Sequence, residues 1–230
     1  MQHHRFLSLI ALAVSLVMLV SCSQEQEKEP SPTPHPKPEP TGKTYVYNCL
    51  EAANIIVKVD TADAWLFLQD TTVHLPQAKS ASGARFMTED YLYWSKGDEA
   101  LVEIDNQSYG YCDVDQKETV WADALLRGAS FRAAGNEPGW YLEVYPDSIK
   151  YVLDYGERTL VTPSPEQEFN TETTEKIYKV ETEEHNVTIR ATDESCTSMA
   201  GKEFESTVYL AVDGKEYQGC GKELRYEMRY

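Results

Sequence analysis

Positive charge is scarce in this sequence. Lysine and arginine together number 21, against 38 aspartate and glutamate residues, so the formal net charge is −17. Binding to nucleic acid needs a basic surface that neutralises phosphates, so no nucleic-acid partner is expected. Long-range attraction favours a basic protein partner. The alternative is that the acidity only keeps the protein soluble, and charge alone favours that alternative.

Motifs for catalysis and metal binding are also lacking. The sequence has no glycine-rich phosphate loop before a helix, no GxSxG and no CxxC. After the proline-rich stretch that ends at Pro40, the only histidines are His74 and His185. In a chain with so many acids, two carboxylates close in sequence do not indicate a catalytic dyad. We therefore expect no cofactor, no metal and no enzymatic activity, and an enzyme with an acidic pair in the C-terminal half is the weakest hypothesis.

Long apolar runs are limited to one, Phe6–Val20, which follows Arg5. Its 15 residues are too few for a transmembrane helix, which needs about 20, and they predict a secretory signal. The run closes with Leu19-Val20-Ser21-Cys22, which resembles the lipobox of bacterial lipoproteins. This resemblance implies removal of the signal peptide 1–21 and a diacylglycerol on Cys22. The residue after Cys22 is Ser23 and not an aspartate, which in such lipoproteins implies sorting to the outer membrane. The alternative is an ordinary signal peptide in which a cysteine occurs by chance.

Residues 22–42 would then form a lipidated N-terminus and tether. Prolines alternate with other residues from Pro30 to Pro40, and acidic and polar residues precede them. Such a composition cannot form a packed core and favours an extended chain. We expect it to lift the folded part off the membrane, with that part facing the periplasm.

Four further cysteines remain: Cys49, Cys112, Cys196 and Cys220. An exported chain meets an oxidising compartment, so an even number of cysteines predicts disulfides. Three pairings are possible, and the spacing favours Cys49–Cys112 and Cys196–Cys220, each within its own segment. A zinc site is the rival interpretation, and the lack of CxxC and of histidines weighs against it.

Residues 43–114 are expected to form short strands, because apolar runs rich in β-branched and aromatic residues recur between turn residues. The expected strands are 45–47, 55–59, 65–68, 72–75, 91–94 and 101–104. This spacing predicts an antiparallel sheet closed into a small barrel or a sandwich. The fold class is therefore mainly β, with a small antiparallel β-barrel stapled by a disulfide.

A helix over Gln116–Arg127 is expected next, within a linker of residues 115–128, and Gly128 is a natural stop. Its expected apolar face consists of Val120, Trp121, Ala124 and Leu125. Residues 129–230 then form a second β-rich domain. Hairpins are expected at Pro146-Asp147 and Asp213-Gly214.

This second domain resembles a domain of uncharacterised bacterial envelope proteins. The segments that carry the resemblance are Phe131–Trp140, Asp154–Glu157, Cys196 with Met199–Gly201, and Gly219–Gly221. The resemblance implies no known activity. Gly135–Gly139 is interpreted as a turn, with a ligand site as the open alternative.

Two motifs in the first domain are more informative. Ser80–Phe86 and Tyr93–Ala100, flanked by Cys49 and Cys112, resemble the family of membrane-bound inhibitors of C-type lysozyme (MliC/PliC). The family fold is a small antiparallel barrel with a disulfide. Two positions depart from the family pattern: Phe86 stands where Tyr is usual, and residues 50–52 lack a Gly often found there.

The resemblance implies that a serine and a lysine reach the catalytic carboxylates of the basic lysozyme. Ser82 lies 14 residues before Lys96, the spacing of the family, so Ser82 and not Ser80 is the match. Gly83 and Gly97 would let the two loops turn tightly. The alternative is a pair of ordinary hairpin turns with Lys96 solvated.

The leading hypothesis is a lipid-anchored proteinaceous inhibitor of C-type lysozyme that protects peptidoglycan, with Ser82, Gly83, Lys96 and Gly97 at the contact. The alternative is an envelope-binding or structural lipoprotein without inhibition. The sequence leaves open which lysozyme is the target.

Overall fold

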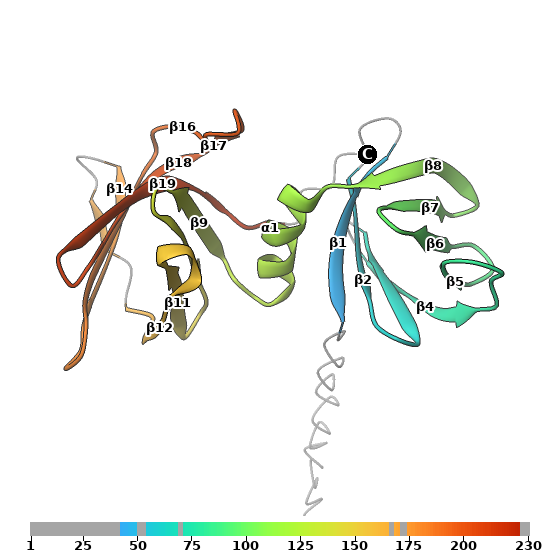
Figure 1. Ribbon diagram of the computed structural model, residues 1–230, viewed down its shortest axis with the longest axis horizontal. Helices are drawn as coiled ribbons and strands as arrows, with labels where there is room; N and C mark the ends of the chain where they lie inside the picture. Colours follow the sequence, from blue (N-terminus) through green and yellow to red (C-terminus); the bar gives the residue numbers. More distant parts are fainter. Residues whose placement is uncertain (1–41, 50–53, 69–70, 166–167, 171–173, 226–230) are drawn as a thin grey trace, which may run out of the picture. The chain divides into compact units, whose positions relative to one another are not determined.

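The computed structural model describes residues 42–49, 54–68, 71–165, 168–170 and 174–225 (Figure 1). The expected signal peptide, the lipidation site Cys22 and almost the whole tether lie outside these residues. So does the departure at residues 50–52.

The first part is a closed eight-stranded barrel with the strands in sequence order. Its strands are β1 Lys43–Asn48, β2 Asn54–Val59, β3 Asp63–Phe67, β4 Thr72–Ala78, β5 Ala84–Met87, β6 Leu92–Lys96, β7 Glu99–Ile104 and β8 Gln107–Val114. All neighbours are antiparallel, and β1 closes on β8 where Tyr47 lies opposite Val114. The barrel and the mainly β fold class predicted from the sequence are thereby confirmed.

Alternation along the strands fills this barrel. In β7, Ala100, Val102 and Ile104 are buried while the residues between them are more exposed, as expected for side chains that point to opposite faces. Phe86 and Tyr93 stack inside with ring centroids 6.0 Å apart. Phe86 is thus a core residue, so its departure from tyrosine does not alter the exposed loops.

One α-helix, α1 Gln116–Leu126, follows β8. Asp115 caps it by accepting hydrogen bonds from the backbone N–H groups of Lys117 and Glu118. Trp121 and Ala124 are buried as expected, but Val120 is 46% exposed, so its assignment to the buried face was wrong. The buried arc turns toward Ala122 instead. None of the helices in the described part of the chain has the length and hydropathy to cross a membrane.

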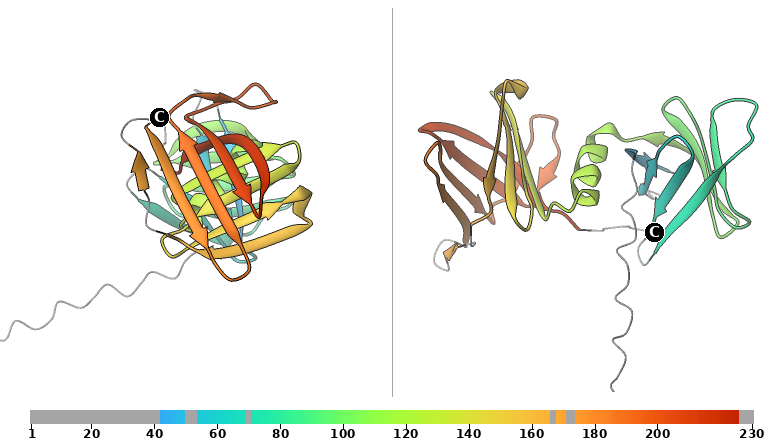
Figure 2. Two further views of the ribbon diagram at one scale, coloured as in Figure 1. Left: turned by 90° about the vertical axis from the view of Figure 1, so that its left-hand side faces the viewer. Right: turned by 90° about the horizontal axis from the view of Figure 1, so that it is seen from below.

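The rest of the described chain forms a nine-stranded antiparallel sheet in the order β12-β11-β10-β9-β19-β18-β15-β14-β13 (Figure 2). Its strands are β9 Phe131–Asn136, β10 Gly139–Val144, β11 Ser148–Leu153, β12 Arg158–Pro163, β13 Glu168–Asn170, β14 Glu175–Glu181, β15 Asn186–Thr192, β18 Ser206–Val212 and β19 Lys215–Glu223. A short helix η2, Asp154–Gly156, lies between β11 and β12, and β16 Cys196–Thr197 pairs with β17 Glu203–Phe204. The expected hairpins at Pro146-Asp147 and Asp213-Gly214 connect β10 to β11 and β18 to β19.

The structure contains two disulfides, Cys49–Cys112 and Cys196–Cys220, the pairing that the spacing favours. The first joins the residue after β1 to β8 and so fastens the barrel where it closes. The second joins β16 to β19. Each bridge lowers the conformational entropy of the unfolded chain between its two cysteines, and this stabilises the folded state.

Candidate functional site

The two sequence motifs lie side by side at one end of the barrel. Ser82 and Gly83 precede β5, while Gly97 follows β6, and these strands are antiparallel with Ala84 opposite Ser95. The start of β5 therefore meets the end of β6. A Cβ atom at Gly83 would lie 2.3 Å from the carbonyl oxygen of Ser95 and 3.3 Å from the Cβ of Lys96. Only glycine permits this close approach, and Gly83 also has a φ of +71°.

The backbone of Ser82 is fixed while its side chain is not. Its carbonyl oxygen accepts hydrogen bonds from the hydroxyl of Ser80 at 2.5 Å and from the indole N–H of Trp94 at 2.9 Å. Its N–H donates to the Ser80 hydroxyl at 3.3 Å. Within the described part of the chain, the exposed Ser82 hydroxyl has no hydrogen-bond partner. Ser80 therefore shapes the loop, and Ser82 presents the available hydroxyl.

Lys96 ends β6 at a two-residue turn that returns to Glu99 in β7. Gly97 has a φ of +65°, a conformation that glycine adopts without a steric cost, although a Cβ there would meet open space. The carbonyl oxygen of Asp98 accepts a hydrogen bond from the N–H of Val114 at 2.8 Å, which ties the turn to β8. Among the residues described, the exposed Lys96 ammonium forms no ion pair.

Two buried tyrosines support β6 from inside the barrel. The hydroxyls of Tyr47 and Tyr93 are 2.8 Å apart and share a hydrogen bond. Burial raises the pKa of both phenols, so both stay neutral at physiological pH. Tyr93 immediately precedes Trp94, so this contact holds the strand from which Trp94 reaches the Ser82 loop.

Acidic residues surround the lysine turn. Glu99 faces Asp113 across β7 and β8, and a shallow hollow is lined by Asp98, Asp113 and Asp115. None of these four carboxylates forms an ion pair with another described residue. Lys117 lines the same hollow, so the exposed Lys96 ammonium lies beside a surface that is mainly but not wholly acidic. Such a surface suits a basic partner carrying a local negative site.

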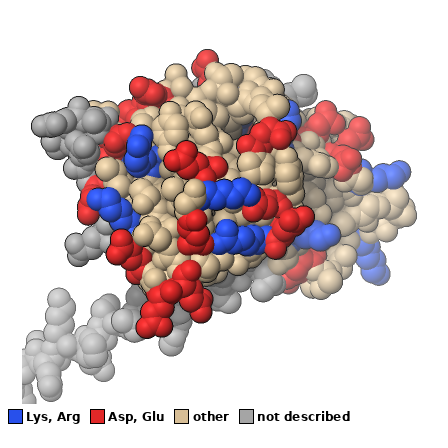
Figure 3. All heavy atoms as spheres, turned by 60° about the vertical axis from the view of Figure 1, so that its left-hand side comes forward, with Lys and Arg blue, Asp and Glu red and all other residues tan. Residues whose placement is uncertain are grey.

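The remaining candidates lie in the C-terminal sheet. Gly135–Gly139 spans the β9–β10 hairpin, in which Glu137 and Pro138 form the turn. The Tyr155 hydroxyl donates to the carbonyl oxygen of Asn136 at 3.1 Å. Lys215 and Tyr217 both donate to Asp154, beside Tyr155. The structure thus brings the Gly135–Gly139 and Asp154–Glu157 motifs together, and the Asp154 carboxylate is paired with Lys215. Figure 3 shows acidic and basic side chains interspersed on the face it brings forward.

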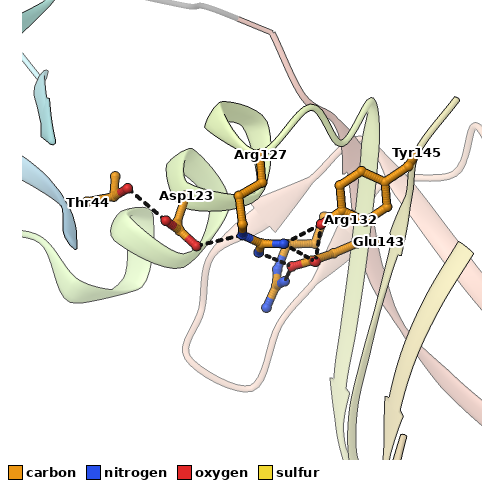
Figure 4. Close-up of polar contacts among 6 residues, drawn as sticks. All are labelled: Thr44, Asp123, Arg127, Arg132, Glu143 and Tyr145. Atoms are coloured by element: carbon orange, nitrogen blue, oxygen red, sulfur yellow. Dashed lines mark hydrogen bonds and ion pairs between the residues drawn. The ribbon is translucent and has the colours of Figure 1, made fainter. Parts of the chain in front are cut away.

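A polar chain around α1 was not foreseen from the sequence (Figure 4). The Thr44 hydroxyl in β1 donates to Asp123 at 2.7 Å, and Arg127 donates to Asp123 at 2.9 Å. Arg127 also makes a two-point contact with Glu143 in β10, at 2.8 and 2.9 Å. The chain of contacts therefore runs from the barrel through the helix to the sheet.

Glu143 is the centre of this network. Its carboxylate is fully buried and is also contacted by Arg132 and by the Tyr145 hydroxyl. Burial alone would raise the pKa of Glu143, but hydrogen bonds from Arg127 and Tyr145 and the two guanidinium charges lower it on balance. Burial, opposed by Glu143, lowers the pKa of Arg132, which stays charged all the same. Glu143 is therefore a stabilising residue enclosed by its partners.

A closed, disulfide-bonded barrel that presents a hydroxyl and an ammonium on adjacent loops has the geometry of a binding module. Residues 47–109, within the barrel, match the model of the family described as membrane-bound lysozyme-inhibitor of c-type lysozyme. The matched stretch includes both loops and confirms the resemblance inferred from the sequence. Searches of curated proteins and of solved structures found no significant match. The likeness of residues 129–230 to an envelope domain stays a prediction.

Within the described residues, no group of three histidine, cysteine, aspartate or glutamate side chains could hold a metal ion. His74 is exposed and pairs with Asp63 at 2.5 Å, and His185 pairs with Asp213 at 3.1 Å. Both histidines therefore have structural partners at the protein surface.

Proposed function

We propose that the barrel inhibits a C-type lysozyme by inserting the Ser82 hydroxyl and the Lys96 ammonium into its catalytic cleft. The observation that carries the proposal is the juxtaposition of the two loops, with Gly83 packed against the backbone of Ser95 and the Cβ of Lys96. Lysozyme hydrolyses its substrate with a glutamate and an aspartate across a cleft. An ammonium can pair with one carboxylate, and a hydroxyl can hydrogen-bond to one.

Preorganisation supports this mechanism. The Ser82 backbone is held by Ser80 and Trp94, and the lysine turn is held by the Asp98–Val114 hydrogen bond. Rigid loops lose little conformational entropy on binding, so more of the contact energy appears as affinity. Because neither functional group has a partner among the described residues, neither must break an internal contact first.

The charge of the chain supports the choice of partner. C-type lysozymes are basic, and this chain has a formal net charge of −17. Opposite net charges accelerate encounter and make the association rate fall with salt. The acidic rim of Asp98, Glu99 and Asp113 would bring that attraction to the contact itself.

Membrane attachment is the second half of the proposal. Cys22 would carry the lipid, residues 22–42 would act as the tether, and the folded part would face the periplasm from the outer membrane. An inhibitor held there would stand between incoming lysozyme and peptidoglycan. The family description, a membrane-bound inhibitor, supports this arrangement.

The proposal is tested by muramidase activity on cell walls with and without the purified protein. Dose-dependent inhibition of a C-type lysozyme by the protein is expected. Binding to another envelope component without inhibition would favour the alternative of an envelope-binding or structural lipoprotein.

Replacing Ser82 by alanine should weaken inhibition less than loss of the lysine charge does. Loss of a neutral hydroxyl that leaves a buried carboxylate without a hydrogen-bond donor costs about 1–3 kcal/mol of affinity. This corresponds to roughly 5- to 150-fold in the inhibition constant. The inhibition constant of Ser82→Ala against wild type measures this. Ser148→Ala, in β11 of the C-terminal sheet, should inhibit as wild type does. An unchanged constant for Ser82→Ala would remove the hydroxyl from the contact.

Replacing Cys22 by serine should block normal processing and membrane attachment. The lipid is added to the cysteine thiol, and a serine hydroxyl does not substitute for it. Membrane fractionation and the apparent mass of the precursor measure the outcome. If Cys22→Ser protein is processed and partitions with membranes as wild type does, the anchor lies elsewhere.

A further inference from the structure

A row of three large side chains, two exposed and one half-buried, crosses the outer face of the barrel beside the two loops. Strand register places Trp94 of β6 opposite Leu101 of β7, and Leu101 opposite Tyr111 of β8. Trp94 is 36% exposed and Tyr111 is 76% exposed. We call Trp94, Leu101 and Tyr111 the aromatic row. Scattered apolar side chains are normal at a surface, but three in adjacent register form a continuous strip.

The aromatic row is continuous with the candidate loops. Trp94 donates its indole N–H to the carbonyl oxygen of Ser82 at 2.9 Å. It also lies two residues before Lys96 on the same strand, so both side chains point to the same face. A partner that received Lys96 would therefore meet Trp94 next.

Arg85 completes one end of the row. It lies opposite Trp94 in β5, with its guanidinium carbon 5.9 Å from the centroid of the Trp94 ring. The Nε atom of Arg85 is buried and has no hydrogen-bond partner among the described residues. The guanidinium lies over the indole, and this cation–π contact favours the observed orientation of the ring.

The surroundings of the row indicate the kind of partner. Glu99 and Asp113 face each other on the same outer face, two residues along β7 and β8 from Leu101 and Tyr111. An apolar centre of Trp, Tyr and Leu with a polar rim is the usual anatomy of a protein–protein contact, and Trp and Tyr are typical hot-spot residues. Because the rim beside Leu101 and Tyr111 is acidic, a basic protein fits that part of the row.

We propose that the aromatic row is a second contact region for the same basic C-type lysozyme, covering the protein surface next to its catalytic cleft. This inference rests on the proposed function. The loops would insert the charged Lys96 side chain into the cleft. Tyr111 would bury apolar surface area at the periphery of the contact. The row would therefore contribute to the lifetime of the complex more than to the rate of encounter.

The test measures binding of the full chain to a C-type lysozyme, with association and dissociation rates recorded at low and at physiological salt. Tyr111→Ala should weaken binding at least about tenfold, mainly through faster dissociation, since loss of a hot-spot residue acts on the bound state. The ratio to wild type should be the same at both salt concentrations, because the lost contact is apolar. Tyr111→Phe keeps the ring and should bind as wild type does.

Tyr209→Ala is the matched control. Tyr209 is an exposed tyrosine on β18 with the Arg190 guanidinium 5.2 Å from its ring, so it resembles the row in chemistry but lies in the C-terminal sheet. It should leave binding unchanged. Retention of the Cys49–Cys112 bridge and an unchanged melting temperature would show that Tyr111→Ala is folded.

The outcomes separate the two proposals. If Tyr111→Ala binds as wild type does while Lys96→Ala loses binding, the row is not a contact and the inserted lysine stands. If Tyr111→Ala loses binding while Lys96→Ala retains it, the row stands and the insertion mechanism fails. If the wild-type protein does not bind a C-type lysozyme, both are wrong.

Discussion

Lys96→Ala should weaken lysozyme inhibition by roughly 30-fold to several thousandfold, with little change in stability. In the bound cleft the ammonium would be desolvated against a carboxylate, and truncating one partner of such a pair costs about 2–5 kcal/mol of affinity. In the free protein the side chain is exposed and forms no ion pair with any described residue, so its loss should barely affect unfolding. Inhibition constants and thermal melting of the same preparation measure both quantities.

Lys79→Ala is the matched control for this prediction. Lys79 is also exposed and lies three residues before Ser82, so its removal changes the net charge by the same amount near the same loops. We expect at most a modest decrease in the association rate. If Lys79→Ala loses inhibition while Lys96→Ala retains it, the inserted-lysine mechanism is wrong, and the acidic surface or another loop carries the binding.

The parts of the fold that sequence could predict are those with a strong local signal. Runs rich in β-branched and aromatic residues marked six of the barrel strands, and the helix was expected over Gln116–Arg127 against the observed Gln116–Leu126. Two barrel strands were not among those expected. β5 has only four residues, and β8 contains Gly110 and several polar residues. Both are strands because closure of the barrel pairs them on each side, a long-range effect that local propensity does not contain.

In the candidate site, too, sequence predicts the features with a local signal and misses those that depend on long-range pairing. The motif spacing singled out Ser82 over Ser80, and the hydrogen bonds of the loop agree with that choice, since Ser80 is engaged with the Ser82 backbone. The role of Trp94 could not be predicted. Its indole reaches the Ser82 carbonyl across 12 residues of sequence, and only the β5–β6 register brings the two together.

The burial of Glu143 could not be predicted from the sequence either. In sequence it lies in a run of apolar residues, Trp140–Tyr145, where an acid would normally point to solvent. In the structure Leu142, Glu143 and Val144 are all buried, so both faces of β10 are covered here. A buried acid is tolerable only because Arg127, the residue that caps the C-terminus of α1, and Arg132 of β9 converge on it. These arginines lie 16 and 11 residues away in the sequence.

Glu143→Ala should therefore destabilise the protein by about 3–5 kcal/mol, because it leaves two arginine charges facing each other without their shared partner. Urea unfolding followed by tryptophan fluorescence measures the loss. Glu168→Ala is the control, since Glu168 pairs with Lys179 at 3.1 Å with both side chains largely exposed. A surface pair of this kind contributes about 0–1 kcal/mol. Equal effects of the two substitutions would contradict the buried network.

The pH dependence of stability provides an independent check. The pKa of Glu143 is lowered from its ordinary value of 4.5, so the folded state favours the ionised carboxylate. A lowered pKa in the folded state contributes stability that is fully present above the unfolded pKa and is lost as the pH falls through the folded one. Wild type should therefore lose stability as the pH falls below about 4.5, the ordinary pKa of the carboxyl group. Glu143→Gln should be less stable than wild type at neutral pH, and the difference between them should shrink on acidification, because protonation removes the same charge that the substitution removes. A difference that stays constant down to acid pH would show that the ionised carboxylate does not stabilise the folded state.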